Sequence, residues 1–148
     1  MRNFTTIDDV LSFALESENQ SIEFYSRLAD NTTREDEKKI FLALMREEIC
    51  HVKKLEYFFS KRNELELSKI DIDLSSNKYL PHIFPAADIA FEECLNIAIQ
   101  KERAAVNLYT DLARESTTQT MIELFRMLAY EETKHALQFE NRYQAAKK

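Results

Sequence analysis

The chain has 148 residues, which is a typical length for one domain with a core of its own. It contains no glycine, and this excludes a P-loop, a G-x-G-x-x-G dinucleotide turn and a G-x-S-x-G nucleophile elbow. Its 20 basic and 26 acidic residues give a net charge of −6, and no Lys/Arg-rich run appears. We therefore expect no nucleic-acid partner.

The start of the sequence, MRNFTTIDDV, has acidic residues where a signal peptide would be apolar. No apolar run approaches the length of a membrane span, so we expect no membrane association. The two cysteines, Cys50 and Cys94, form no C-x-x-C motif and no disulfide framework. These features together predict a cytoplasmic protein, and the cysteines are interpreted as plain thiols.

Apolar residues recur at helical spacing in four segments, which predicts helices over 6–30, 34–61, 87–114 and 118–145. Thr6 and Thr33, each followed three residues later by an acidic residue, are the expected N-caps of the first two helices.

The segment 61–86 between the second and third helices holds both prolines and is too varied for a flexible linker. We interpret it as a crossover connection. It either returns along the bundle within one chain or lets two chains exchange their halves, and the sequence leaves both open.

The sequence repeats itself at a distance of 84 residues. Residues 14–29 align with 98–113, and residues 41–56 align with 125–140 without a gap. The repeat predicts an all-α four-helix bundle in a single domain, 1–148. Its hairpins span about 6–60 and 87–145, and the crossover spans 61–86.

Polar residues interrupt the apolar faces of the helices at matching places in both repeats. Glu18 lies between Leu15 and Ile22, and five further polar residues interrupt the apolar faces in the same way. In each hairpin an E-x-x-H pair follows the single glutamate by 30 residues, so all three reach about the same height of an antiparallel hairpin. The six candidate metal ligands are Glu18, Glu48, His51, Glu102, Glu132 and His135.

Four buried carboxylates carry about four negative charges, which are costly to bury without partners. Two divalent cations balance them, and a set of carboxylate and imidazole ligands suits iron or manganese, with zinc as a further option. A single E-x-x-H pair is more often surface charge. The prediction of a metal site therefore depends on two pairs and two single glutamates at equal spacing.

These residues resemble the ligand set of rubrerythrin-type di-iron domains of the ferritin-like superfamily. The resemblance covers both hairpins and implies a ferritin-like fold with two iron ions. By resemblance, Glu48 and Glu132 bridge the irons. Glu18 with His51 then serves one iron, and Glu102 with His135 serves the other. The implied activity is a di-iron oxidoreductase that reduces H2O2 or O2 in oxidative-stress defence.

Three departures from related proteins refine this expectation. The paired C-x-x-C motifs of a rubredoxin domain are missing, so electrons are expected from a separate donor such as a rubredoxin-like protein. Ala105 stands where rubrerythrins have an additional glutamate linked to peroxidase behaviour. Ile49 stands where bacterioferritin has its haem-ligating methionine, so no haem is predicted.

Tyr25 and Tyr109 each follow a predicted ligand glutamate by seven residues, two helical turns along the same face. They are interpreted either as core aromatics or as catalytic residues that hydrogen-bond to a ligand or donate an electron.

Two further functions stay open at this point, a ferroxidase subunit of an iron-storage shell and a non-catalytic metal-binding bundle. A homodimer is expected, with exchange of helices between chains as one possible form.

Overall fold

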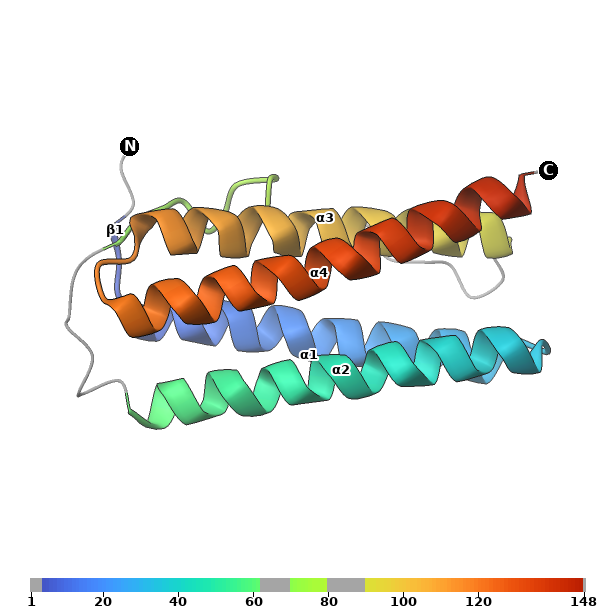
Figure 1. Cartoon of the computed structure of the whole chain (residues 1–148), viewed down its shortest axis with the longest axis horizontal. Coiled ribbons are helices and arrows are strands. Elements are labelled where there is room, and N and C mark those ends of the chain that lie inside the picture. The colour runs from blue at the N-terminus through green and yellow to red at the C-terminus, as the bar shows by residue number, and fades with distance from the viewer. Residues whose placement is uncertain (1–3, 62–69, 80–89, 148) are drawn as a thin grey trace. The chain divides into compact units, whose positions relative to one another are not determined.

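Two helical hairpins account for most of the chain (Figure 1). The computed structural model describes residues 4–61, 70–79 and 90–147. Helices α1 (Ile7–Asn31) and α2 (Glu35–Ser60) pack together, as do α3 (Phe91–Glu115) and α4 (Gln119–Ala146). The chain divides into two compact units, one of residues 5–69 and one of residues 1–4 with 70–148. Each unit therefore contains one hairpin.

The observed helices agree with the predicted ones to within a few residues at each end. The largest difference is the start of α3 at Phe91 instead of 87, and residues 87–89 lie outside the described part of the chain. No helix among the described residues combines the length and apolar character that crossing a membrane requires.

The predicted N-cap of α1 is confirmed, whereas that of α2 is wrong. The Asp9 N–H donates to Thr6 Oγ1 at 3.1 Å, and the Thr6 N–H donates to Asp9 Oδ2 at 3.3 Å, which together form a capping box. Helix α2 is preceded by Arg34, whose side chain makes no capping hydrogen bond, and not by Thr33. Three acidic residues in the first turn of α2 favour the positive end of the helix dipole instead.

Each hairpin buries an apolar face along both of its helices. Tyr25 in α1 and Phe125 in α4 are among the largest fully buried side chains. Leu15 and Ile22, which flank Glu18 in the sequence, are only half-buried, because the core-facing stripe of α1 runs through Leu11, Ala14, Glu18, Tyr25 and Leu28. Glu18 therefore occupies a core position of α1 and is more buried than Leu15 and Ile22.

The predicted crossover is described only from Ile70 to Tyr79 and at residue 61, and the rest of 61–86 lies outside the described residues. Strand β2 (Ile70–Asp71) pairs with the two-residue strand β1 (Phe4–Thr5). Ile70 and Ile72 are buried, and Asp71 and Asp73 between and after them are exposed. This alternation is what an extended segment with one covered side requires.

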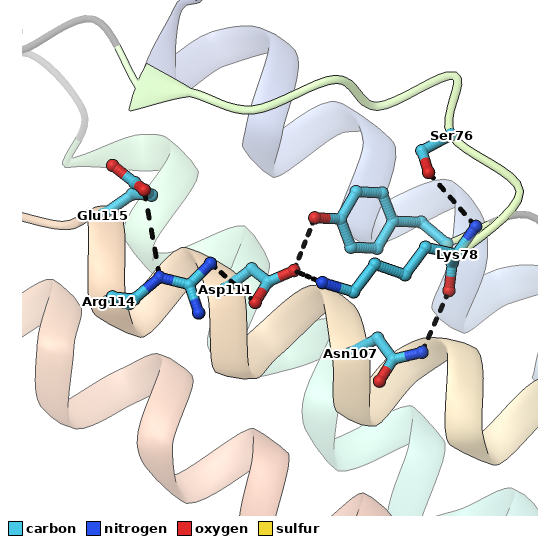
Figure 2. A network of polar contacts seen from close by, with 7 residues as sticks. Ser76, Lys78, Asn107, Asp111, Arg114 and Glu115 are labelled. Atoms are coloured by element: carbon cyan, nitrogen blue, oxygen red, sulfur yellow. Dashed lines mark hydrogen bonds and ion pairs between the residues drawn. The ribbon is translucent and has the colours of Figure 1, made fainter.

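A buried carboxylate in α3 holds the end of this segment (Figure 2). Asp111 Oδ2 accepts hydrogen bonds from Lys78 Nζ and from the Tyr79 hydroxyl, each at 2.6 Å. Arg114 Nη2 lies 2.8 Å from Asp111 Oδ1, and the Asn107 side chain donates to the Lys78 carbonyl at 3.3 Å. Residues 78 and 79 are thereby fixed against α3 within one unit.

The charges around Asp111 set the protonation of the network. Burial raises the pKa of Asp111, but the hydrogen bonds from Lys78 and Tyr79 and the charges of Lys78 and Arg114 outweigh burial, so its pKa lies below the usual value. Burial and the hydrogen bond to Asp111 raise the pKa of the Tyr79 phenol. Asp111 is therefore ionised and Tyr79 neutral at pH 7.

Substitution of Asp111 by alanine is expected to lower the free energy of unfolding by about 1–3 kcal/mol at pH 7, because Tyr79 loses its buried hydrogen-bond acceptor. A carboxylate whose pKa is lowered in the folded state stabilises above its unfolded pKa of about 3.9. The difference between wild type and variant should therefore shrink as the pH falls through the lowered pKa. Urea unfolding between pH 3 and pH 7 measures this. An equal difference at every pH would show that the charge of Asp111 contributes nothing.

Candidate metal centre

The first hairpin brings three of the predicted ligands together. Glu18 comes from the middle of α1, and Glu48 and His51 come from successive turns of α2. His51 Nδ1 lies 3.5 Å from Glu18 Oε2 and 3.7 Å from Glu48 Oε2. One oxygen or nitrogen of each residue lies within 4.8 Å of those of the other two. These three residues are called the α1–α2 triad below.

The second hairpin repeats this arrangement with Glu102 of α3 and with Glu132 and His135 of α4. His135 Nδ1 lies 3.6 Å from Glu102 Oε2 and 3.7 Å from Glu132 Oε2. One oxygen or nitrogen of each residue again lies within 4.8 Å of those of the other two. These residues form the α3–α4 triad, and the corresponding distances in the two triads differ by 0.1 Å at most.

The spacing within each triad suits a metal ion. Ligand atoms about 2.1 Å from one ion are separated by about 3.0 Å when adjacent and about 4.2 Å when opposite. The distances of 3.5–3.7 Å from each imidazole nitrogen to its two carboxylates lie between these limits. In both triads the nitrogen that faces the carboxylates is Nδ1, so Nδ1 is the imidazole atom placed to bind a metal ion.

All six side chains are buried, and none has more than 4 % of its side-chain surface exposed. Each triad therefore holds two carboxylates and one imidazole away from bulk water. This donor set fits a divalent cation of the iron or manganese type, which removes the cost of burying the negative charge. The predicted combination of both triads in one layer stays a prediction.

The raised pKa of Glu102 also reflects the cost of burying negative charge. Burial raises the pKa of Glu102, and the charge of Glu132 and a hydrogen bond with it raise that pKa further, whereas His135 lowers it. The net pKa of Glu102 lies well above the ordinary value. In the α3–α4 triad without metal, the ionised form of this carboxylate is thus disfavoured, and a bound cation would reverse that preference.

Tyr25 and Tyr109 lie where the sequence predicts, two turns beyond Glu18 and Glu102 on the buried faces of α1 and α3. Their exposed fractions are 0 % and 1 %, so both are core residues. The Tyr109 ring stacks on Phe125 at a centroid distance of 6.2 Å. Their predicted catalytic role stays a prediction.

Neither cysteine lies among the triads. Cys50 is exposed on α2, and Cys94 is half-buried near the start of α3. Burial, followed by the negative charge of Glu93, raises the pKa of the Cys94 thiol, which reduces its thiolate fraction. The structure thus favours the interpretation of Cys94 as an unreactive thiol.

One contact between α3 and α4 lies outside the set of residues predicted from the sequence. Arg103, directly after Glu102, donates from Nε to Glu140 Oε1 at 3.0 Å, and its Nη2 contacts the same oxygen. A comparison of the two repeats singles out this pair. Glu140 has an identical counterpart in the first repeat, Glu56, whereas the counterpart of Arg103 is the uncharged Asn19. Differences between the repeats thus point to residues that serve one hairpin only.

Two solved structures share the fold of this chain. A protein of Thermotoga maritima, provisionally described as a ferritin-like diiron-carboxylate protein, matches with a TM-score of 0.81 and 18% identity over 99% of both chains. A hypothetical protein of Pyrococcus furiosus matches with a TM-score of 0.71 and 21% identity over 93% of this chain and 87% of its own. The predicted fold class, an all-α ferritin-like four-helix bundle, is confirmed.

No curated protein matches the sequence. The sequence model of the rubrerythrin family matches residues 9–91 and 93–148, which together include both triads and nearly all of both hairpins. The chain therefore belongs to the rubrerythrin family.

Proposed function

We propose that the protein is a non-haem di-iron oxidoreductase that reduces H2O2 or O2 with electrons from a separate donor, in defence against oxidative stress. The observation that carries this proposal is the pair of buried triads with matching geometry in a chain of the rubrerythrin family. In this proposal the two triads supply the ligands of one pair of iron ions. Iron is favoured over manganese and zinc because the resembling domains hold iron.

In this proposal the residues of the chain would bind the irons, orient them and exclude water. By resemblance to rubrerythrin-type domains, Glu48 and Glu132 would be ligands of both irons. Glu18 and His51 would complete the ligands of one iron, and Glu102 and His135 would complete those of the other. Four carboxylates offset the charge of two divalent ions, and the low exposure of all six side chains keeps bulk water from the site. The irons, when bound, supply the electron transfer to the oxidant.

Tyr25 and Tyr109 are proposed to support the ligands from two turns away. Both are buried on the ligand-bearing faces, where a phenol hydroxyl needs a polar partner. A hydrogen bond from such a hydroxyl would fix the orientation of a ligand carboxylate. The packing of Tyr109 on Phe125 holds its ring in place for that role.

The electron donor is proposed to be a separate rubredoxin-like protein. Cys50 and Cys94 are separated by 43 residues in the sequence, so they make no paired C-x-x-C site for a rubredoxin-type iron. We further propose a cytoplasmic homodimer, in line with the acidic net charge of −6 and the free thiols.

A ferroxidase of an iron-storage assembly is the second candidate, and Ala105 favours it. Ala105 lies three residues after Glu102, at the position where rubrerythrins have a further glutamate. Without that carboxylate the ligand set is symmetric, as in the di-iron centre of bacterioferritin. The two candidates differ in the oxidant that they prefer and in how much iron they take up.

Anaerobic titration with Fe(II), followed by rapid mixing with H2O2 or O2 in separate runs, tests the proposal. We expect two Fe(II) bound per chain and faster oxidation by H2O2 than by O2, as a rubrerythrin-type enzyme requires. Faster oxidation by O2 together with uptake of more iron after the first two ions would establish the ferroxidase instead. Binding of fewer than two Fe(II) per chain would contradict the di-iron centre.

A further inference from the structure

The two triads have the same geometry but different surroundings. In the first repeat Glu18 is followed by Asn19, whereas in the second Glu102 is followed by Arg103. The glutamate five residues after the histidine is present in both repeats, as Glu56 and Glu140. Because asparagine carries no charge, an ion pair at this place exists only in the second hairpin.

The ion pair connects the two helices that carry the α3–α4 triad. Arg103 Nε and Nη2 both contact Glu140 Oε1, so two nitrogen atoms of the guanidinium share one carboxylate oxygen. Arg103 adjoins Glu102 on α3, and Glu140 lies five residues beyond His135 on α4. The contact therefore ties α3 to α4 within two helical turns of the triad along each helix.

A pocket of about 420 Å³ opens between α3 and α4 at the same place. Ile99 is its buried apolar residue, and the other lining residues are polar or aromatic: Asn96, Arg103, Glu140, Asn141, Tyr143 and Gln144. Close apolar packing of the two helices is interrupted where a pocket lies between them. The Arg103–Glu140 pair, which forms part of the wall, is the polar contact that spans this interruption.

We propose that Arg103 and Glu140 are positioning residues that fix the spacing of α3 and α4 at the α3–α4 triad, so that this triad holds its metal ion more tightly than the α1–α2 triad. This inference rests on the proposed di-metal centre. It assigns the α1–α2 triad as the position that loses its ion first, for lack of an equivalent ion pair. The two metal positions are thus unequal although their ligands are alike.

The sign of the effect separates positioning from simple charge. A guanidinium near a metal site repels a cation, so loss of its charge alone would strengthen metal binding. If Arg103 acts through the helix spacing, its loss weakens metal binding instead. Exposed ion pairs contribute little, and the Arg103 side chain is 63% exposed, so we expect a change of about two- to fivefold in affinity.

The experiment uses the full chain with Co(II) as the probe metal, bound anaerobically and measured by calorimetry. His51→Gln disables the α1–α2 triad, and His135→Gln disables the α3–α4 triad. We expect the single Co(II) to bind more tightly to the His51→Gln protein than to the His135→Gln protein. Added to His51→Gln, Arg103→Gln is expected to raise the Kd about threefold, whereas added to His135→Gln it should change nothing.

A matched control and a rescue complete the design. Arg27→Gln removes an ion pair with Glu23 whose arginine is as exposed as Arg103 but which lies within one helix, so it should leave both affinities unchanged. The reversed pair, Arg103→Glu with Glu140→Arg, is expected to restore the affinity to within about twofold of the parent. Thermal unfolding without metal confirms that each variant is folded.

Three outcomes would overturn the inference. They are tighter or unchanged Co(II) binding after Arg103→Gln, an equal or reversed order of the two histidine variants, and no binding at all to the His51→Gln protein. Failure of the unmodified chain to bind two Co(II) would instead contradict the proposed di-metal centre. The two levels of the proposal therefore fail in different ways.

Discussion

Substitution of Glu132 by alanine is expected to abolish binding of two Fe(II) ions per chain and to weaken the binding that remains by at least about 100-fold. Removal of groups that only orient metal ligands costs about 10- to 100-fold in affinity, and loss of a ligand costs more. In the proposed centre Glu132 would be a ligand of both irons, so its loss would remove two metal bonds. It also leaves about three negative charges for two divalent ions.

The repeat provides a second test of the same expectation. Glu48 occupies the equivalent position in α2, with the same 3.7 Å separation from its histidine. Glu48→Ala should therefore lose two-iron binding to a similar degree. Glu123→Ala, which removes an exposed glutamate of α4, serves as the control and should keep two irons. Anaerobic Fe(II) titration measures all three variants, and two tightly bound irons in either ligand variant would exclude the assigned bridging role.

The sequence indicates which carboxylates are buried, because a charged residue on the apolar face of a helix interrupts its periodic pattern. Glu18 and Glu102 occupy positions where the helical period demands an apolar residue, and no ordinary core accepts a charge there without a partner. A single E-x-x-H motif is weak evidence for a metal site, and its repetition after 84 residues makes that evidence much stronger. The grouping of three candidate ligands within each hairpin follows from helix geometry alone.

The contacts that distinguish the hairpins are harder to predict. Asp111 of α3 is buried, but its partners Lys78 and Tyr79 come from the crossover, whose path no local period specifies. Its repeat equivalent, Arg27, is exposed, so α3 buries a position that α1 leaves in solvent. The predicted start of α2 is wrong for a related reason. Thr33 is a residue type that often caps helices. Helix boundaries are uncertain by one or two residues, however, and α2 begins one residue later than Thr33 as its N-cap would require.

Substitution of Glu102 by glutamine is expected to stabilise the protein without metal and to destabilise it with metal, relative to wild type. Without metal, the ionised Glu102 carboxylate is opposed first by burial and then by the charge of Glu132, which together raise its pKa. Glutamine has nearly the same shape and no charge. We therefore expect the free energy of unfolding of the metal-free variant at pH 7 to exceed that of wild type by about 1–3 kcal/mol.

The pH dependence of this difference has a definite sign. Because the pKa of Glu102 is higher in the folded chain than in the unfolded chain, the folded state binds the proton more tightly. The stability of metal-free wild type should fall as the pH rises above the unfolded pKa of about 4.3 and through the raised value. The glutamine variant lacks this contribution, so the two proteins should differ least near pH 4. Urea unfolding in chelator from pH 4 to pH 8 measures the difference.

Metal should reverse the order of the two proteins. A ligand at about 1,000 times its Kd adds about 4 kcal/mol to the stability of the state that binds it. Wild type is expected to gain this from Fe(II) under anaerobic conditions, whereas Glu102→Gln, with one carboxylate fewer, gains much less. Glu123→Gln should behave as wild type in both conditions. If wild type is the more stable protein even without metal, the Glu102 carboxylate has a compensating partner in the chain itself, and the triad serves stability instead of a cation. If the order reverses with Fe(II), the stability lost to buried charge in the metal-free chain is what the metal ion restores.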